Sequence, residues 1–142
     1  MYKDILVTVD LDHESSWKKA VPVAIKQAQS FGARLHVLTV VPSVGMSMVG
    51  QFFPKGYEGK VLEAYNQRLH EFVSEHIPSD IKVQHIVGQG TVYEVILKMA
   101  KKTNCDLIVI GAHRPELKDY LLGPNAARVV RHADCSVMVV RD

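Results

Sequence analysis

Short apolar runs separated by helical stretches are the feature that most constrains the fold of this chain. Four of these runs are rich in β-branched residues and carry apolar residues on both faces, as parallel strands covered by helices do. The run 81–87 alternates more and stops at Gly88. The expected strands are therefore 4–9, 34–41, 81–87, 106–110 and 136–140.

Between the runs, apolar residues recur at steps of three and four, which is the period of an amphipathic helix. These stretches run from Trp17 to Phe31, from Val61 to Val73, from Thr91 to Lys102 and from Pro124 to Val130. Pro22 lies inside the first of them, so a kink or a late start is expected there.

Strand and helix thus alternate four times before a final strand. This order predicts an α/β fold: a doubly wound, five-stranded parallel sheet with helices on both faces, Rossmann-like, with strand order 3-2-1-4-5. The length of 142 residues is that of one domain, which would span 1–142.

The composition excludes several classes of protein. Lys and Arg number 17 and Asp and Glu 15, so the net charge of +2 argues against binding nucleic acid through bulk charge. No apolar run approaches the ~18 residues of a membrane span. The acidic start of the chain is unlike a secretory leader, so a cytoplasmic protein without membrane or nucleic-acid partners is expected.

The two cysteines, far apart in the chain, favour reduced, buried thiols over a disulfide or a metal site.

In a doubly wound sheet, ligands bind beyond the carboxyl ends of the strands where the strand order reverses. Asp10 follows the first strand and Gly111 ends the fourth. Asp10 can accept hydrogen bonds from sugar hydroxyls or from a base, or it can cap the helix that follows. Gly111 permits close backbone approach, or it simply forms a turn. The start of the last helix near Gly123 offers free N–H groups to an anion.

The loop ahead of the last helix carries His113 and Arg114. The guanidinium fork of Arg114 suits a phosphate, and His113 can donate as well; both can equally be solvated side chains. Asp10 and Asp12 could hold Mg²⁺, but a capping and solvated pair fits them better, and the histidines lack the spacing of metal ligands. Dinucleotide fingerprint, P-loop, zinc-protease helix and nucleophile elbow are all missing, so no catalytic or metal-binding residue is predicted.

One stretch, 43–59, fits neither the strand nor the helix pattern. It holds four glycines among methionines and phenylalanines, and it is too long for a simple connector. Two interpretations stay open: a flap over a site, or a loose excursion with partly buried aromatic side chains.

Four stretches of the sequence resemble the universal stress protein family: 5–10, 32–40, 100–111 and 123–140. The resemblance covers almost the whole chain. It implies a small cytoplasmic α/β domain, usually dimeric, with an adenine nucleotide alpha-hydrolase-like fold. The loop from His113 to Gly123 is similar to that of a bacterial branch, the F- and G-type single-domain members.

Many members of this family bind ATP through a pattern Gly-x2-Gly-x9-Gly-[Ser/Thr] after the fourth strand. By that resemblance Gly111 and Gly123 match the first and third glycines. Asp10 matches the acidic residue at the adenosine end, and Val40 lies where the family offers backbone contacts to adenine.

The chain departs from this pattern at the phosphate end. Arg114 stands at the position of the second glycine, and Pro124 stands at the position of the Ser or Thr. Eight residues, rather than nine, separate Arg114 from Gly123. One hydroxyl and one N–H are thereby lost from the phosphate cradle. The nucleotide-binding residues implied by the resemblance are Thr8, Val9, Asp10, Val40, Ile110, Gly111, His113, Arg114, Gly123, Pro124 and Asn125.

The resemblance favours a stress-response module that binds ATP or a related adenine nucleotide, with or without Mg²⁺ and without fast turnover. The main alternative is a dimeric stress-response interaction protein with weakened or lost nucleotide binding. A slow ATPase is a further alternative, although no general base is evident. A homodimer, or a larger oligomer built on it, is expected through the apolar edge strand Val137, Met138, Val139 and Val140.

Overall fold

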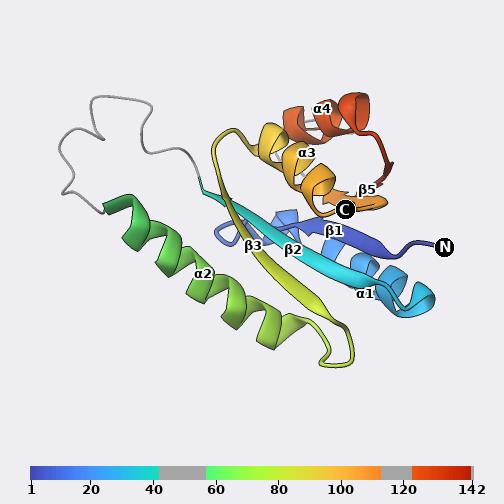
Figure 1. Cartoon of the computed structure of the whole chain (residues 1–142), viewed down its shortest axis with the longest axis horizontal. Helices are drawn as coiled ribbons and strands as arrows, with labels where there is room; N and C mark the ends of the chain where they lie inside the picture. The colour runs from blue at the N-terminus through green and yellow to red at the C-terminus, as the bar shows by residue number, and fades with distance from the viewer. Residues whose placement is uncertain (42–56, 113–122, 142) are drawn as a thin grey trace.

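The sheet of the computed structural model, which describes residues 1–41, 57–112 and 123–141, has five strands that all run parallel (Figure 1). Their order is β3-β2-β1-β4-β5, so the predicted α/β fold and strand order are confirmed. The strands are β1 (Asp4–Thr8), β2 (Arg34–Val41), β3 (Val83–Gln89), β4 (Leu107–Gly111) and β5 (Ser136–Val140).

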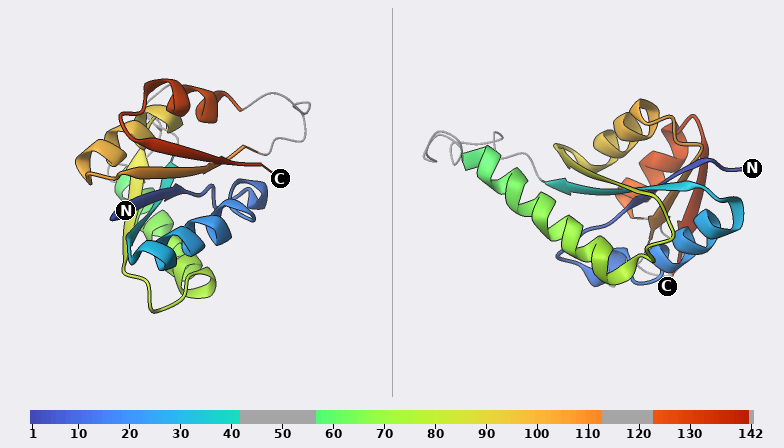
Figure 2. Two further views of the ribbon diagram at one scale, coloured as in Figure 1. Left: turned by 90° about the vertical axis from the view of Figure 1, so that its right-hand side faces the viewer. Right: turned by 60° about the horizontal axis from the view of Figure 1, so that its bottom comes forward.

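Two helices cover each face of the sheet. In Figure 1 and in the right panel of Figure 2, α1 (Ala20–Phe31) and α2 (Tyr57–His76) lie on one side, with α3 (Val92–Lys102) and α4 (Pro124–His132) on the other. Alternate residues of β1 enter the two cores: Ile5 and Val7 pack on the α1 and α2 side, and Leu6 on the α3 and α4 side. All three are fully buried, which explains why the central strands read as continuous apolar runs.

The first helix starts late, as Pro22 predicted. A short 3₁₀ turn, η1 (Glu14–Ser16), precedes it, so Trp17 lies outside the helix. Pro22 then falls in the first turn of α1, where its missing N–H leaves no helical hydrogen bond unmade.

The expectation that β3 ends before Gly88 is wrong. The strand continues to Gln89, and Gly88 pairs with Val40 of β2. A Cβ at Gly88 would lie 2.3 Å from Cγ1 of Val95, so the glycine is there because α3 packs directly on the strand. The unassigned stretch is also shorter than expected, because α2 already begins at Tyr57; residues 42–56 lie outside the described part of the chain.

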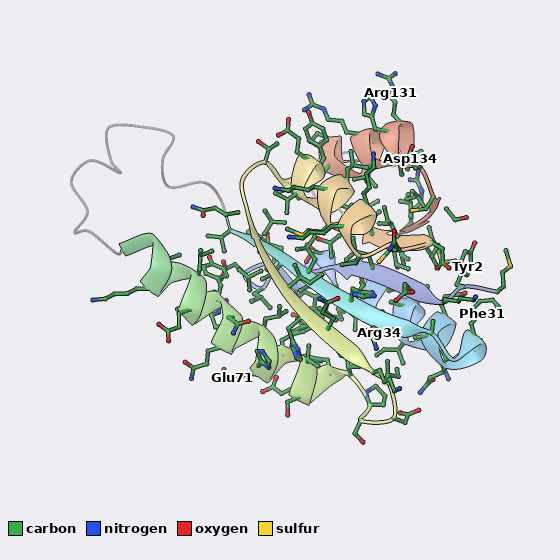
Figure 3. All side chains as sticks on the ribbon, viewed as in Figure 1. Tyr2, Phe31, Arg34, Glu71, Arg131 and Asp134 are labelled. Atoms are coloured by element: carbon green, nitrogen blue, oxygen red, sulfur yellow. The ribbon has the colours of Figure 1, made fainter. Side chains whose placement is uncertain are left out.

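Two large apolar side chains of the helical pattern do not enter the core. Val130 of α4, one of the apolar residues of the predicted helix 124–130, is 47% exposed. Phe31 at the end of α1 is 38% exposed and meets Tyr2 edge to face, with ring centroids 5.4 Å apart (Figure 3).

Both cysteines are free thiols held away from water. Cys105 is buried and Cys135 half-buried. Burial raises the pKa of Cys105 to about 11 and also raises the pKa of Cys135, which keeps both thiols protonated and poorly nucleophilic. Over the described ranges, none of the helices combines the length and the apolar character that crossing a membrane requires.

Candidate functional site

A hollow of about 490 Å³ opens at the carboxyl end of the sheet, where the strand order reverses between β1 and β4. The ends of β1, β2 and β4 form its floor, and the starts of α3 and α4 and the loop after β1 form its walls. Eight of the predicted site residues line it: Thr8, Val9, Asp10, Val40, Ile110, Gly111, Gly123 and Asn125.

The remaining predicted residues do not join this group in the described structure. Pro124 is the first residue of α4, and its side chain is exposed rather than part of the lining. His113 and Arg114 lie outside the described residues, so their predicted role at the phosphate end stays a prediction.

The hollow has an apolar interior and a polar rim. Val40 and Ile110 close it from the sheet, and Val92, Ile96 and Ala126 close it from the two helices. The loop after β1 supplies the polar rim, which consists of Asp10, His13, Ser15 and Ser16. The lining therefore offers apolar contacts inside and hydrogen-bonding groups at the mouth.

Hydrogen bonds within the loop after β1 hold Asp10 in place. Its carboxylate Oδ1 accepts the backbone N–H of Asp12 at 3.0 Å, and its Oδ2 lies 2.8 Å from Nδ1 of His13. Its backbone N–H donates to Ser16 Oγ at 2.9 Å, and the Ser16 hydroxyl donates to the carbonyl of His13 at 2.8 Å. Asp10 thus lines the hollow and caps a turn of its own loop. The expectation that it caps the following helix is wrong, because the N-cap position is His13 in η1 and Lys19 in α1.

The fold itself requires a glycine at position 111, whether or not a ligand binds. A Cβ at this position would lie 2.5 Å from the backbone carbonyl oxygen of Ser16. The close approach predicted for Gly111 is therefore made by the loop after β1, which rests against the end of β4. This contact sets the position of the loop at the mouth of the hollow.

The start of α4 lies at the hollow. Gly123 is the N-cap, and its carbonyl accepts the first helical hydrogen bond, from the N–H of Ala127 at 3.0 Å. Pro124 has no N–H, so Asn125 and Ala126 carry the first-turn N–H donors, which have no partner among the described residues, and both residues line the hollow. This end of the helix favours a negative group.

Asp12 turns away from Asp10 and ties the loop to α2. Its carboxylate accepts a hydrogen bond from Arg68 at 2.8 Å, and the hydroxyl of Tyr65 donates to it at 3.5 Å. This hydrogen bond raises the pKa of Arg68. In the described structure Asp10 pairs with His13 and Asp12 with Arg68, so each of the two carboxylates has a partner of its own. No cluster of three potential metal ligands occurs within the described ranges.

Sequence reasoning missed part of the lining. His13, Ser15 and Ser16 are surface-type residues, and the available signal was their place in the loop directly after Asp10, at the reversal of strand order. Val92 and Ile96 belong to the apolar positions of the predicted helix 91–102, and nothing in that pattern distinguishes them as part of a site. Their position in the first turns of α3, which begins at the same end of the sheet, is what brings them to the hollow.

Comparisons with known proteins match almost the whole chain to one protein family. Residues 1–141 match the model of the Universal stress protein family. Universal stress protein G of Escherichia coli O157:H7 is 32% identical over 143 residues, covering 99% of this chain and 100% of that protein. The structure of universal stress protein UspA from Lactobacillus plantarum matches with a TM-score of 0.72 at 27% identity, covering 99% of this chain and 98% of that one. The fold also matches a universal stress protein in complex with cAMP, with a TM-score of 0.62 at 22% identity, covering 99% of this chain and 97% of that one.

Proposed function

The chain belongs to the universal stress protein family, and from that premise we propose that it is a stress-response module that binds an adenine nucleotide in the hollow between β1 and β4. In this proposal the base enters the apolar interior, the ribose lies at Asp10, and the phosphates extend toward the start of α4. Binding rather than fast turnover is proposed, since Asp10 is the single carboxylate among the described lining residues and is already paired with His13.

The observation that carries the proposal is the convergence of four distant segments on one hollow. Asp10, Val40, Gly111 and Gly123 come from the loop after β1, from β2, from β4 and from the start of α4, and all four line the same 490 Å³ space. They are the positions at which the sequence resembles the ATP-binding members of the family. The related structure that holds cAMP supports an adenine nucleotide as the class of ligand.

The phosphate end of the proposed site depends on few donors. Asn125 and Ala126 offer backbone N–H groups there, while Pro124 offers none. Each missing hydrogen bond to a charged phosphate costs about 1.5–3 kcal/mol, or about one to two decades in affinity. We therefore propose that the adenosine part contributes most of the affinity, and that Arg114 offsets part of the loss for ATP.

Isothermal titration calorimetry with ATP, ADP, AMP and cAMP tests this function. We expect binding of at least one of them, weakened about tenfold or more by Asp10→Asn, which removes the charge without changing the shape of the side chain. The matched control is His132→Ala, because His132 is exposed in the last turn of α4 and does not line the hollow. If none of the four nucleotides gives heat or a thermal shift at about millimolar concentration, the proposed function is wrong.

The second candidate function is that of a homodimeric interaction module. β5 lies at the outer edge of the sheet, beside β4 (left panel of Figure 2). Its side chains are half-buried against both cores, with Val137 and Val139 on the α3 and α4 side and Met138 and Val140 on the other. The free element is thus the backbone edge of an apolar strand, which favours pairing with a second copy.

A further inference from the structure

The carboxylate of Asp10 is exposed and yet fixed. Its side chain is 53% exposed, a level at which an aspartate normally samples several rotamers. Both of its oxygens are nevertheless engaged: Oδ1 by the backbone N–H of Asp12 and Oδ2 by Nδ1 of His13. Within the described residues, His13 is the one side chain that contacts this carboxylate.

The contact defines the protonation of the His13 ring. A carboxylate only accepts hydrogen bonds, so Nδ1 of His13 must carry the proton at 2.8 Å from Oδ2. The carboxylate has about four acceptor positions, of which His13 and the backbone use two. One further acceptor position remains on each oxygen, an arrangement that suits two neighbouring hydroxyl groups.

We infer that His13 is a positioning residue that fixes the Asp10 carboxylate for a vicinal diol, and so sets the preference of the hollow for ribonucleotides over 2′-deoxyribonucleotides. This inference rests on the proposed nucleotide binding and adds a residue and a specificity to it. His13 lines the hollow beside Asp10, so its action is local to the rim where the sugar would lie.

His13 contributes little to the fold through this contact. The side chain is 71% exposed, and an exposed ion pair of this kind adds at most about 1 kcal/mol to stability. Substitution of His13 is therefore expected to leave a folded protein, which circular dichroism checks. A change in sugar preference can then be attributed to the orientation of Asp10.

The test compares the affinities of ATP and 2′-deoxyATP for the intact protein and for variants. We expect the intact protein to prefer ATP by about tenfold or more, because the deoxy sugar leaves one charge-assisted hydrogen bond unmade. His13→Ala should reduce this ratio to about threefold or less. His13→Asn, whose side-chain amide places a donor where Nδ1 stood, should restore it. His132→Ala is the matched control and should leave the ratio unchanged.

A ratio that His13→Ala leaves intact would overturn the inference. The same holds if Asp10→Asn retains the preference, because the sugar would then not lie at Asp10. Binding of neither ATP nor 2′-deoxyATP by the intact protein is a different result, which refutes the proposed nucleotide binding itself. Equal affinity of the intact protein for the two refutes the sugar preference while nucleotide binding stands.

Discussion

A pair of stacked histidines makes the stability of this protein sensitive to mild acid. His70 of α2 and His85 of β3 lie face to face, with ring centroids 3.7 Å apart and planes inclined by 13°. Burial, and secondly the nearby charge of His70, lowers the pKa of His85 below its ordinary value of 6.5. The folded protein therefore binds fewer protons than the unfolded chain once the pH falls below about 6.5, and acid favours unfolding. The loss of stability grows until the pH has passed the folded pKa of His85, and it is absent well above pH 6.5.

The size of the effect follows from the geometry. Two positive charges about 4 Å apart repel by about 1 kcal/mol in water and by about 4 kcal/mol at an effective dielectric constant of 20. His70 is exposed, so the mutual repulsion belongs near the lower figure. Because burial is the larger cause of the lowered pKa, His85→Gln should remove more of the acid sensitivity than His70→Gln does.

Urea unfolding at about pH 7.5 and about pH 5.5 measures this difference. Far-UV circular dichroism is the better signal, because the fluorescence of the single tryptophan, Trp17, also depends on its contact with His76, at 4.7 Å between ring centroids. We expect the intact protein to lose more stability on acidification than His85→Gln, by at most about 1.4 kcal/mol at one pH unit below 6.5, with His70→Gln in between. Equal pH dependence of the three proteins, or the reverse order of the two variants, would refute the reasoning.

Three further predictions follow from the site and the sheet edge. Gly111→Ala places a Cβ 2.5 Å from the carbonyl oxygen of Ser16, so it should lower stability by about 1–3 kcal/mol in thermal unfolding and weaken ATP binding; an unchanged melting temperature contradicts this. Arg114→Ala should weaken ATP about tenfold or more relative to AMP in calorimetry, whereas equal effects on both would assign Arg114 to solvent or to an exposed ion pair. Val139→Lys should yield monomers in light scattering, and a persisting dimer would place the interface elsewhere.

Periodicity and strand chemistry predicted most of the fold. β2 and β5 have the predicted bounds, and the helix after β1 begins late, as Pro22 requires. The error at Gly88 has a physical cause: a glycine that ends a strand and a glycine that admits a helix look alike in sequence. Only the 2.3 Å approach of Val95 in space distinguishes them.

The site residues whose positions follow from the sheet topology were predictable from the sequence, whereas those placed by local loop geometry were not. Asp10 and Gly111 follow from the rule that ligands bind where the strand order reverses, because both residues directly end or follow strands. His13 and Ser16 enter the site through hydrogen bonds of a short loop, and these depend on backbone angles that no apolar pattern encodes. The apolar pattern does not distinguish Val92 from a core residue, because a residue at the start of a helix can contact both the core and a ligand pocket, as Val92 does.

These contacts also decide which residues report on function. Gly111 matches the nucleotide-binding pattern, but the carbonyl of Ser16 would require a glycine there even in a protein that binds nothing. Its match therefore argues weakly for a ligand. Asp10 and His13 are different: both are more than half exposed, and their mutual contact contributes little to folding. We therefore expect substitution of His13 to change ligand binding more than stability, whereas substitution of Asp10 also removes the hydrogen bond to the Asp12 N–H.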